Sequence, residues 1–505
     1  MALQQSKQAT PDEVFAAFFA MEEKVKKMSR DDLMNLSEEE ILTLGEPVRL
    51  ATEGTIKLSE KTLRQLREPL EELTGRILTM TREEYMALGR EIDNIITPEN
   101  DFAHERRSLS AGQIKEILLE LNGGMAMASS STCEQMFTMQ GDRVILMPGD
   151  NFNLANSVCP AGTLYYITGT HNGQTVHSSK TGNSWVGGGS AVMNGQNSTN
   201  RAFNGGMTNN SISWIEVRNY TDYGIYSGSS NSQNITIKNM RFKNIGAGKT
   251  GEFYGAIQFD NTKNIGVQYS YFENVTSSVR FRFSDGPLRV LNNEALNTGR
   301  NFFQCVNCTG SDIIINNNSL EHTTKFGLDD LEDFINIFQS NGASSSNRIE
   351  VNQNRARTNA TGSGVSKYGS FIILGDRGGV WQKAESNIGV NTGNVGIGAA
   401  GGEGIQVNTN KMFSIAIENL SNVAFYSYRY QGNEPCGNHS FSGNVAHWRC
   451  HRPDLNCTVS GTLNKATAPE FNSSPIYCGL TDSLINHQTR VAEDTSMGPE
   501  IWNEW

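Results

Sequence analysis

The chain has 505 residues, with 42 Lys and Arg against 53 Asp and Glu, a formal net charge of -11 and a pI near 5.4. This acidic balance excludes a general binder of nucleic-acid phosphates, which needs a basic surface. No run of about 18 apolar residues is present to span a membrane. The start of the chain, MALQQSKQATPDEVF, also lacks the basic flank and apolar stretch of a secretory signal. We therefore expect no nucleic-acid partner and no membrane insertion.

The first 124 residues differ in composition from the rest of the chain. Of these residues 40 are charged, whereas only 55 of the remaining 381 are. Capping boxes, in which a Ser or Thr precedes an acid by three residues, begin several predicted helices at Thr10, Ser37 and Thr81. We expect an α-helical segment whose apolar faces either pack together in a bundle or assemble several chains.

Internal repetition dominates the second part of the chain. The run Asn234–Ile237 leads to Phe242, and Asn264–Val267 leads to Phe272 with the same spacing, 30 residues later. Similar short strands, each followed by Asn-rich turns, begin at these positions: Leu288, Ile313, Ile349 and Ile405. Coils of this length with alternate apolar residues favour a parallel β-helix, in which stacked Asn side chains bond from coil to coil. An antiparallel sandwich or a propeller is the alternative.

These patterns predict a mainly β protein that contains a parallel β-helix (solenoid) and a separate N-terminal α-helical domain. The expected domains are an α-helical assembly or docking domain (1–124), a linker with the entry or cap of the β-helix (125–210), the β-helix itself (211–432), and its last coils and cap (433–505).

Three segments carry a resemblance to a known family: 332–340 (EDFINIFQS), 372–379 (IILGDRGG) and 422–426 (NVAFY). With the repeats between about 210 and 480, they resemble the right-handed parallel β-helix proteins of the pectate-lyase-like superfamily, within a subgroup found in bacterial and phage-encoded proteins. That superfamily includes polysaccharide lyases, glycoside hydrolases, epimerases, phage tailspikes and non-catalytic fibres, so the resemblance implies the fold and leaves the activity open. The pectate-lyase Arg signature, the Asp calcium pair and the GHG motif of polygalacturonases were not found.

An acidic cluster near residue 330 is the first candidate for chemistry. Hydrolysis of a glycosidic bond needs two carboxylates, roughly 5 to 10 Å apart. In a strand, Asp330 and Glu332 would point one way and Asp333 the other; if the strand starts later, the first three acids lie in a loop. Asp376, on the next recognisable coil, is expected to stack near Asp333. The candidate catalytic residues are Asp329, Asp330, Glu332, Asp333 and Asp376.

Two other interpretations of this cluster stay open. A lyase would use Lys325 or His322 as a base and a cation or an arginine to neutralise a uronate. Alternatively, the acids cap loops and bond backbone amides between coils, and Asp376, which lies among glycines, fits this structural role well.

Aromatic and basic residues supply candidate sugar contacts, because sugar rings stack on aromatic faces. Three tyrosines alternate along one strand and should share a face. The candidate substrate-binding residues are Lys325, Arg377, Tyr426, Tyr428 and Tyr430. Weaker candidates on consecutive coils are Glu252, Asp260, Glu273 and Asp285, with Arg280 and Arg282.

The eight cysteines allow three interpretations. Free buried thiols are the expectation for a chain made in a cytoplasm. Zinc would accept the spacing of Cys436, His439, His447 and Cys450. The resemblance implies a bond between Cys436 and Cys478. The sequence Cys305-Val306-Asn307-Cys308 lacks the fold context of a redox motif. We expect no cofactor and no metal.

The combined features suggest a tailspike-like virion protein. Residues 1–124 would dock to other tail or baseplate proteins of a virion, and the β-helix, as a homotrimer, would bind a host surface polysaccharide with or without cleaving it. The expected location is the virion, made in the host cytoplasm, with an extracellular location as the alternative. A non-catalytic fibre or adhesin, and a bacterial polysaccharide lyase or glycoside hydrolase, are the competing functions.

Overall fold

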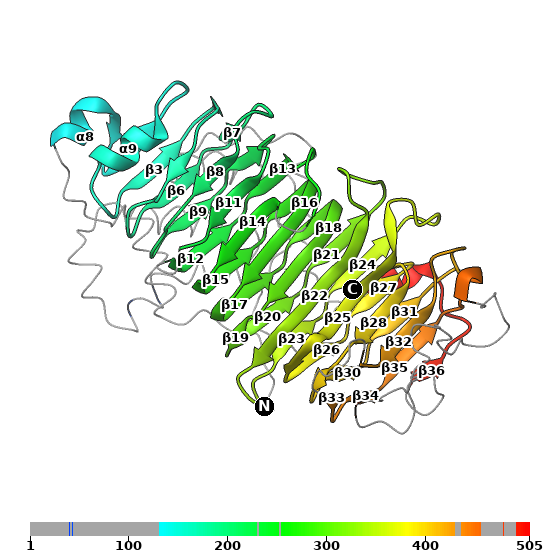
Figure 1. Cartoon of the computed structure of the whole chain (residues 1–505). Helices are drawn as coiled ribbons and strands as arrows, with labels where there is room; N and C mark the ends of the chain where they lie inside the picture. Colours follow the sequence, from blue (N-terminus) through cyan, green and yellow to red (C-terminus); the bar gives the residue numbers. More distant parts are fainter. Residues whose placement is uncertain are drawn as a thin grey trace, which may run out of the picture. The chain divides into compact units, whose positions relative to one another are not determined.

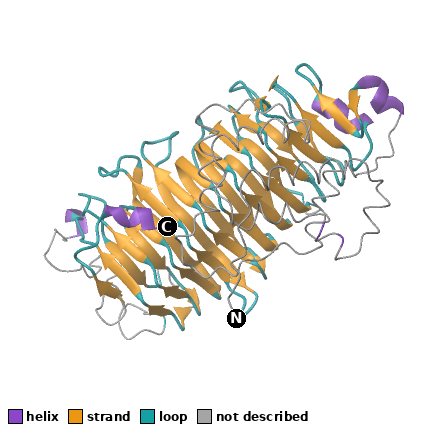
Figure 2. Ribbon diagram, turned by 180° about the vertical axis from the view of Figure 1, so that it is seen from behind, coloured by secondary structure: helices purple, strands orange, loops and turns teal. Residues whose placement is uncertain are grey.

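The computed structural model describes residues 131–229, 232–251, 254–429, 436–455 and 491–504, together with the single residues 40, 43 and 478. The α-helical domain expected for residues 1–124 lies outside the described residues, apart from two isolated helical positions. Figure 2, with strands in orange, shows that the described part is mainly β. None of the described helices is long and apolar enough to cross a membrane.

The described chain forms two compact units. In its described part, the smaller unit holds residues 131–146 with two short returns of the chain, Tyr166–Gly169 and Gly187–Ser190. It contains helix α8 (Ser131–Met136) and the antiparallel pair β1 (Thr138–Gln140) and β2 (Arg143–Leu146). The larger unit begins with helix α9 (Phe152–Val158) and contains the repeated coils.

Parallel strands of the larger unit stack in three ladders, and each coil contributes a segment to each ladder in turn (Figure 1). Ladder 1 contains β6 (Ser184–Gly187), β9 (Ser211–Ser213), β12 (Gln233–Lys238), β15 (Lys263–Gln268), β17 (Asp285–Leu291), β20 (Ile313–Asn316), β23 (Ile349–Asn352), β26 (Gln382–Glu385), β30 (Gln406–Asn408) and β34 (Ser440–Ser442).

The other two ladders share the long strands β16 (Tyr271–Arg282) and β18 (Glu294–Val306), which run through both. Ladder 2 also contains β4 (Thr170–Asn172), β7 (Val192–Asn194), β10 (Glu216–Arg218), β13 (Arg241–Ile245), β21 (Ser319–His322), β24 (Arg355–Thr358), β27 (Ile388–Val390), β31 (Lys411–Phe413), β35 (Asn444–His447) and β36 (Val491–Glu493). Ladder 3 also contains β5 (Val176–His177), β8 (Arg201–Asn204), β11 (Tyr223–Ser227), β14 (Gly255–Asp260), β22 (Leu331–Gly342), β25 (Val365–Val380), β28 (Val395–Ala399) and β32 (Val423–Ser427).

Shorter elements complete the described chain. They are β3 (Leu164–Ile167), β19 (Thr309–Gly310), β29 (Gly402–Glu403), β33 (Cys436–Gly437) and the 3-10 helices η1 (Pro453–Leu455) and η3 (Pro499–Glu504). Helix η3 covers part of ladder 2, where Trp502 lies against the guanidinium groups of Arg355 and Arg357 at 4.4 and 4.5 Å.

The core is built from columns of apolar residues that stay in register from coil to coil. In ladder 1, Ile237 pairs with Val267, which pairs with Val290, and all three are fully buried. Phe242 and Phe272 stack with ring centroids 5.2 Å apart. A single coil could not bury these side chains alone, so the coils stabilise one another. The repeats seen in the sequence are therefore confirmed as rungs of a parallel, β-helix-like solenoid.

Asparagine stabilises the corners of the coils in two ways. Many Asn residues have positive φ, for example Asn234 and Asn264 at 57° and 54°, a region that Asn tolerates better than most residues. Between ladders 1 and 2 a buried asparagine ladder also runs through six coils. Each side chain donates from Nδ2 to the Oδ1 of the next, over 2.9 to 3.1 Å, through Asn293, Asn318, Asn354, Asn387, Asn410 and Asn444. The expected stacking of Asn between coils is confirmed.

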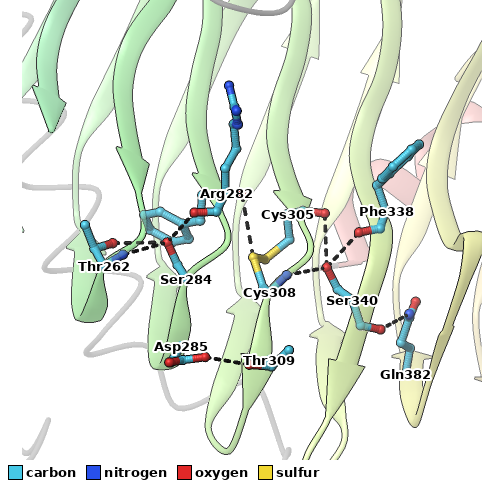
Figure 3. The surroundings of a disulfide bond; sticks show 11 residues. Thr262, Arg282, Ser284, Asp285, Cys305, Cys308, Thr309, Phe338, Ser340 and Gln382 are labelled. Atoms are coloured by element: carbon cyan, nitrogen blue, oxygen red, sulfur yellow. Dashed lines mark hydrogen bonds between the residues drawn. A yellow bond between two sulfur atoms is a disulfide. The ribbon is translucent and has the colours of Figure 1, made fainter. Parts of the chain in front are cut away.

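Disulfides replace the free thiols that we expected. Cys436 and Cys478 are bonded, as the resemblance implied, and so are Cys305 and Cys308 at the turn after β18 (Figure 3). The Cys308 amide donates to the Ser340 hydroxyl over 2.9 Å, which secures this turn to the next coil. The remaining described cysteines, Cys133, Cys159 and Cys450, are also disulfide-bonded. The expectation of free thiols was wrong for every cysteine in the part of the chain that the structure describes.

Candidate functional site

The candidate site lies on the outer face of ladder 3, the side that faces away from the core. Phe303, Ile335 and Ile372 form one fully buried core column of this ladder. The next residue along each strand points to the opposite side. These outward positions carry polar side chains over several coils and then apolar ones. In register order they are Gln258, Arg280, Gln304, Asn336, Ile373, Gly398 and Tyr426.

Two of the predicted acids meet on this face. Asn336 Nδ2 donates to Asp333 Oδ2 and to Asp376 Oδ2, over 2.9 Å in each case. Because both oxygens bond the same nitrogen, they lie no farther apart than twice that distance. Asp333 is 7% exposed, whereas Asp376 is half-buried. The acid pair is therefore held by one amide between two coils.

Irregular backbone brings Asp376 to this position. The pairing of β22 with β25 shifts register between Asn336 and Phe338, and Asp376 pairs with Phe338. Gly375 and Arg377, on either side of Asp376, both have positive φ, at 62° and 53°. A Cβ at Gly375 would come within 2.1 Å of a backbone oxygen, so glycine is required there. The bulged strand thus directs Asp376 toward Asn336 instead of along a regular column.

The environment of Asp333 favours its protonated form. Burial raises the pKa of this carboxyl well above its usual range, and the charges of Glu332 and Asp376 raise it further. Hydrogen bonds from Asn336 and Ser370 act in the opposite direction. A carboxyl that holds its proton at neutral pH, beside a second carboxyl, is the arrangement of a general acid and its partner.

The other three acids of the cluster are engaged with cations or backbone. Strand β22 begins at Leu331, so Asp329 and Asp330 lie in the preceding loop. Asp330 pairs with Lys325 at 2.8 Å, and both side chains are exposed. Glu332 pairs with Arg300 at 2.6 Å. These ion pairs support the structural interpretation for Asp330 and Glu332.

Asp329 joins two loops that are separated by two intervening coils, those of β16 and β18. Its Oδ2 accepts a hydrogen bond from the Gly251 amide over 2.6 Å and lies 4.0 Å from the Arg300 guanidinium. Gly251 belongs to the loop between β13 and β14, whereas Asp329 belongs to the loop between β21 and β22. The loops thus meet above β16 and β18, which have no loop of their own at this corner.

The groups that a lyase would use are poorly placed. His322 is fully buried, and burial lowers its pKa to about 4. Lys325 is occupied by Asp330. Arg377 is exposed, and its guanidinium lies 5.6 Å from the centre of the Phe338 ring, at the rim of the acid pair. Arg377 directly follows Asp376 in the chain and is exposed, whereas the exposed Lys325 is already paired with Asp330.

Tyr426 lies on the same outer face as the acids, whereas Tyr428 lies beyond the end of β32 and joins Tyr426 in an apolar cluster. Tyr426 and Tyr428 are each 7% exposed and pack with Ile373 and Val423. The Tyr426 ring lies across Gly398, where a Cβ would approach it to 2.3 Å. Tyr430 lies outside the described residues. Two predicted sugar-stacking residues are therefore adjacent to the acid pair but mostly covered.

The weaker candidates do not form a single groove. Asp260 lies on the outer face of ladder 3 and accepts hydrogen bonds from Gln258, whereas Glu273 pairs with Lys243 and Asp285 with Thr309. Arg280 and Arg282 follow one another on ladder 3, and Glu252 is not among the described residues. Near Asp260, the Tyr226 ring has Arg201 at 4.3 Å and Tyr223 at 4.9 Å, so this ring is already covered by protein.

Zinc coordination by the predicted cysteines and histidines is not supported. Cys436 and Cys450 are disulfide-bonded, and no group of three metal-ligating His, Cys, Asp or Glu residues exists among the described residues. His439 instead bonds Ser427 Oγ at 2.7 Å and the Gly402 carbonyl at 3.0 Å. The zinc interpretation was wrong for the described part of this motif.

Two of the buried histidines, His322 and His439, should make the fold sensitive to acid. Burial lowers the pKa of His322 and of His439 from 6.5 to about 4. The unfolded chain therefore binds protons at a higher pH than the folded chain. Above pH 6.5 these histidines do not lower the free energy of unfolding. As the pH falls toward 4, the free energy of unfolding decreases by up to about 3 kcal/mol for each histidine.

Urea unfolding at several pH values between 4 and 7 measures this effect. We expect His322→Gln to reduce the loss of stability on acidification relative to the unmodified chain. The raised pKa of Asp333 has the opposite effect, because it lowers the free energy of unfolding as the pH rises. Asp333 is present in both proteins, so its contribution cancels in the comparison. Equal pH dependence in the two proteins would contradict the assignment of His322 as a buried neutral group.

Sequence reasoning missed three amide residues at the site: Asn301, Gln304 and Asn336. All are less than 9% exposed, and each has an amide oxygen with no hydrogen-bond partner among the described residues. Asn301 pairs in register with Asp333, and Gln304 pairs with Asn336. Asn and Gln are common in the repeats, so composition alone gave no signal for these positions.

Comparisons with known proteins add one structural similarity. No protein-family model matches the sequence, and no curated protein matches it. The fold is similar to a crystal structure of the GH136 lacto-N-biosidase from Eubacterium ramulus, in its selenomethionine derivative. The two share 10% sequence identity with a TM-score of 0.36, over 86% of this chain and 93% of that chain.

Proposed function

We propose that this protein binds a cell-surface glycan on the outer face of ladder 3 and hydrolyses it with Asp333 and Asp376. The observation that carries the proposal is the shared hydrogen bond from Asn336, which holds the two carboxylates in fixed proximity. The fold that we propose for the whole chain is a right-handed parallel β-helix of the pectate-lyase-like type, preceded by an α-helical domain.

The separation of the acids favours a double displacement. Retaining glycosidases hold their carboxyls about 5 to 5.5 Å apart, whereas inverting enzymes leave about 6.5 to 9.5 Å for a water molecule. The shared amide keeps the bonded oxygens of Asp333 and Asp376 no farther apart than twice 2.9 Å, which is below the range of inverting enzymes. Asp333 would protonate the leaving oxygen, and ionised Asp376 would attack the anomeric carbon. Water would then release the sugar, with Asp333 taking the proton of that water.

Incubation of the full-length protein with capsule, lipopolysaccharide and plant-type polysaccharides tests this function. We expect new reducing ends without the ultraviolet absorbance of an unsaturated uronate. Absorbance that rises together with reducing ends would indicate elimination and contradict hydrolysis. NMR of the first product should show retention of the anomeric configuration.

A non-catalytic glycan-binding fibre is the second candidate, and one observation favours it. Asp333 is only 7% exposed, and the neighbouring acids Asp330 and Glu332 are paired with Lys325 and Arg300. Binding without new reducing ends across the panel would support this function. Arg377, at the exposed rim, and Tyr426 and Tyr428, in the adjacent cluster, would contact the glycan in either case.

Attachment to a virion completes the proposal. Residues 1–124 would dock to tail or baseplate proteins, and three chains would assemble side by side. The disulfides suit a protein that works outside the reducing cytosol, as an exposed virion component or an extracellular protein does. Removal of residues 1–124 should abolish incorporation into particles and leave glycan binding intact. Incorporation of the shortened chain would contradict the docking role.

A further inference from the structure

Three amide groups around the acid pair have oxygens that lack partners. Asn301 and Gln304 lie on β18 and Asn336 lies on β22, so the three groups occupy adjacent coils of ladder 3. Their exposed fractions are 2%, 8% and 4%, respectively, and their amide oxygens make no hydrogen bond among the described residues. An unsatisfied buried polar atom costs roughly 1 to 3 kcal/mol. Three such atoms in one place indicate a ligand.

The orientation of two of these amides is fixed by what their nitrogens bond. Asn336 Nδ2 donates to two carboxylates, and Asn301 Nδ2 donates to the backbone carbonyl of Asp333 over 3.0 Å. These partners offer oxygen acceptors to the nitrogens, and the protonated form of Asp333 still leaves Asp376 as an acceptor. The amide oxygens of Asn301 and Asn336 are therefore the atoms left without a partner, and an amide oxygen can only accept a hydrogen bond.

Acceptors of this kind select the chemistry of the ligand. A sugar hydroxyl donates a hydrogen bond, whereas a carboxylate or sulfate only accepts. An anionic group beside the amide oxygens of Gln304 and Asn336 would also face the Asp376 carboxyl. Arg280 lies on the coil before Gln304, whereas Asn336 lies on the coil after it. The charge of Arg280 is therefore one coil farther from the acids than Gln304 is.

We infer that Asn301, Gln304 and Asn336 form a subsite that accepts hydrogen bonds from hydroxyls of a neutral sugar ring at the point of cleavage. This inference rests on the proposed function and extends it, because it names the substrate class as a neutral glycan and excludes a uronate at this position. The side chain of Gln304, unlike those of Asn301 and Asn336, makes no hydrogen bond among the described residues. Its replacement therefore tests the subsite most directly.

Replacement of Gln304 by Met separates a ligand role from a structural role. Met has a similar length and removes the unpartnered amide, so the unligated Gln304→Met protein should be at least as stable to heat as the unmodified chain. Its KM for a cleavable neutral glycan should rise about tenfold with kcat changed less than about threefold, since one hydrogen bond to the substrate is lost. A structural role would instead lower the melting temperature and leave KM unchanged.

Gln258→Met is the matched control on the same outer face. Gln258 is also buried, but its Nε2 donates to Asp260 and its Oε1 accepts from Tyr223, over 3.0 and 3.3 Å. We expect this variant to lose stability and to keep the KM of the unmodified chain. An equal rise in KM for both variants would overturn the assignment of Gln304, because it would indicate a general disturbance of ladder 3.

Matched glycans test the substrate class independently of cleavage. The probes are uronate polysaccharides and their carboxyl-reduced forms, measured for binding to the full chain with Asp333→Asn to prevent turnover. Tighter binding of the carboxyl-reduced member supports the inference, whether or not the unmodified chain cleaves either member. Absence of cleavage would contradict only the proposed hydrolysis. Tighter binding of the uronate, or binding of neither member in any pair, overturns the inference.

Discussion

Asp333→Asn should reduce the turnover of a cleavable glycan at least about a hundredfold, because a general acid contributes roughly 100- to 10,000-fold to the rate. The amide has nearly the shape of the acid but supplies no proton to the leaving oxygen. Asp376→Asn should have an effect at least as large, since it removes the nucleophile. Reducing-end assays under saturating substrate measure both variants.

Asp330→Asn is the control for the acid pair. Asp330 lies three residues before Asp333, in the exposed loop that precedes β22, and pairs only with Lys325 among the described residues. We expect its turnover to stay within about twofold of the unmodified chain, since exposed ion pairs contribute little. Full activity of Asp333→Asn, or a loss in Asp330→Asn as large as that in Asp333→Asn, would remove Asp333 and Asp376 as the reacting pair.

The pH profile gives a second test of the same acid. Because burial and neighbouring charges raise the pKa of Asp333, the active protonated form should persist at neutral pH and the rate should fall as the pH rises through that pKa. The residual activity of Asp333→Asn should lack this alkaline decline. An unchanged decline in the variant would assign the titration to another group.

Asn354→Ala, in the middle of the asparagine ladder, should cause a large loss of stability, on the order of 4 kcal/mol. Asn354 Nδ2 donates to Asn387 Oδ1 and to the carbonyl of Ile315, and Asn354 Oδ1 accepts from the Asn318 amide and side chain. The residue is fully buried. Alanine would leave each of these partners buried without a hydrogen bond.

Asn172→Ala is the comparison at the exposed end of another row of stacked asparagines. Asn172 accepts one hydrogen bond, from Asn194, and its side chain is exposed. Water replaces that bond, so the expected loss is below about 1 kcal/mol. Urea unfolding of the two variants should separate them clearly. Similar losses would show that the buried ladder adds no stability beyond that of an exposed pair.

The parts of the fold that could be predicted are those that depend on local periodicity. The runs at Ile235 and Ile265 alternate apolar residues with polar residues or glycine, and alternation is set by the pleat of each strand. Their pairing across coils followed from equal spacing, and the structure confirms it. The Cys436–Cys478 bond was implied by the resemblance, whereas the Cys305–Cys308 bond was not expected, because four consecutive residues carry no information on the turn that they form.

The acid pair depends on register, which the sequence does not reveal. Asp333 and Asp376 were both predicted as candidates, but not their common partner Asn336. The loop before β22 and the register shifts within β22 and β25 decide which residues of adjacent coils meet. Such bulges change the alignment by single residues, and no periodicity in the sequence marks their positions. The roles of the predicted catalytic and sugar-binding residues remain predictions.

The corner between ladders 2 and 3 differs widely in length from coil to coil. Strands β16 and β18 pass this corner without a break, whereas eight residues separate β21 from β22 and nine separate β31 from β32. The core columns on either side stay in register regardless. The corner can therefore lengthen or shorten at little cost to the stacked coils, and sequence change there can alter the loops beside the acid pair on an unchanged scaffold.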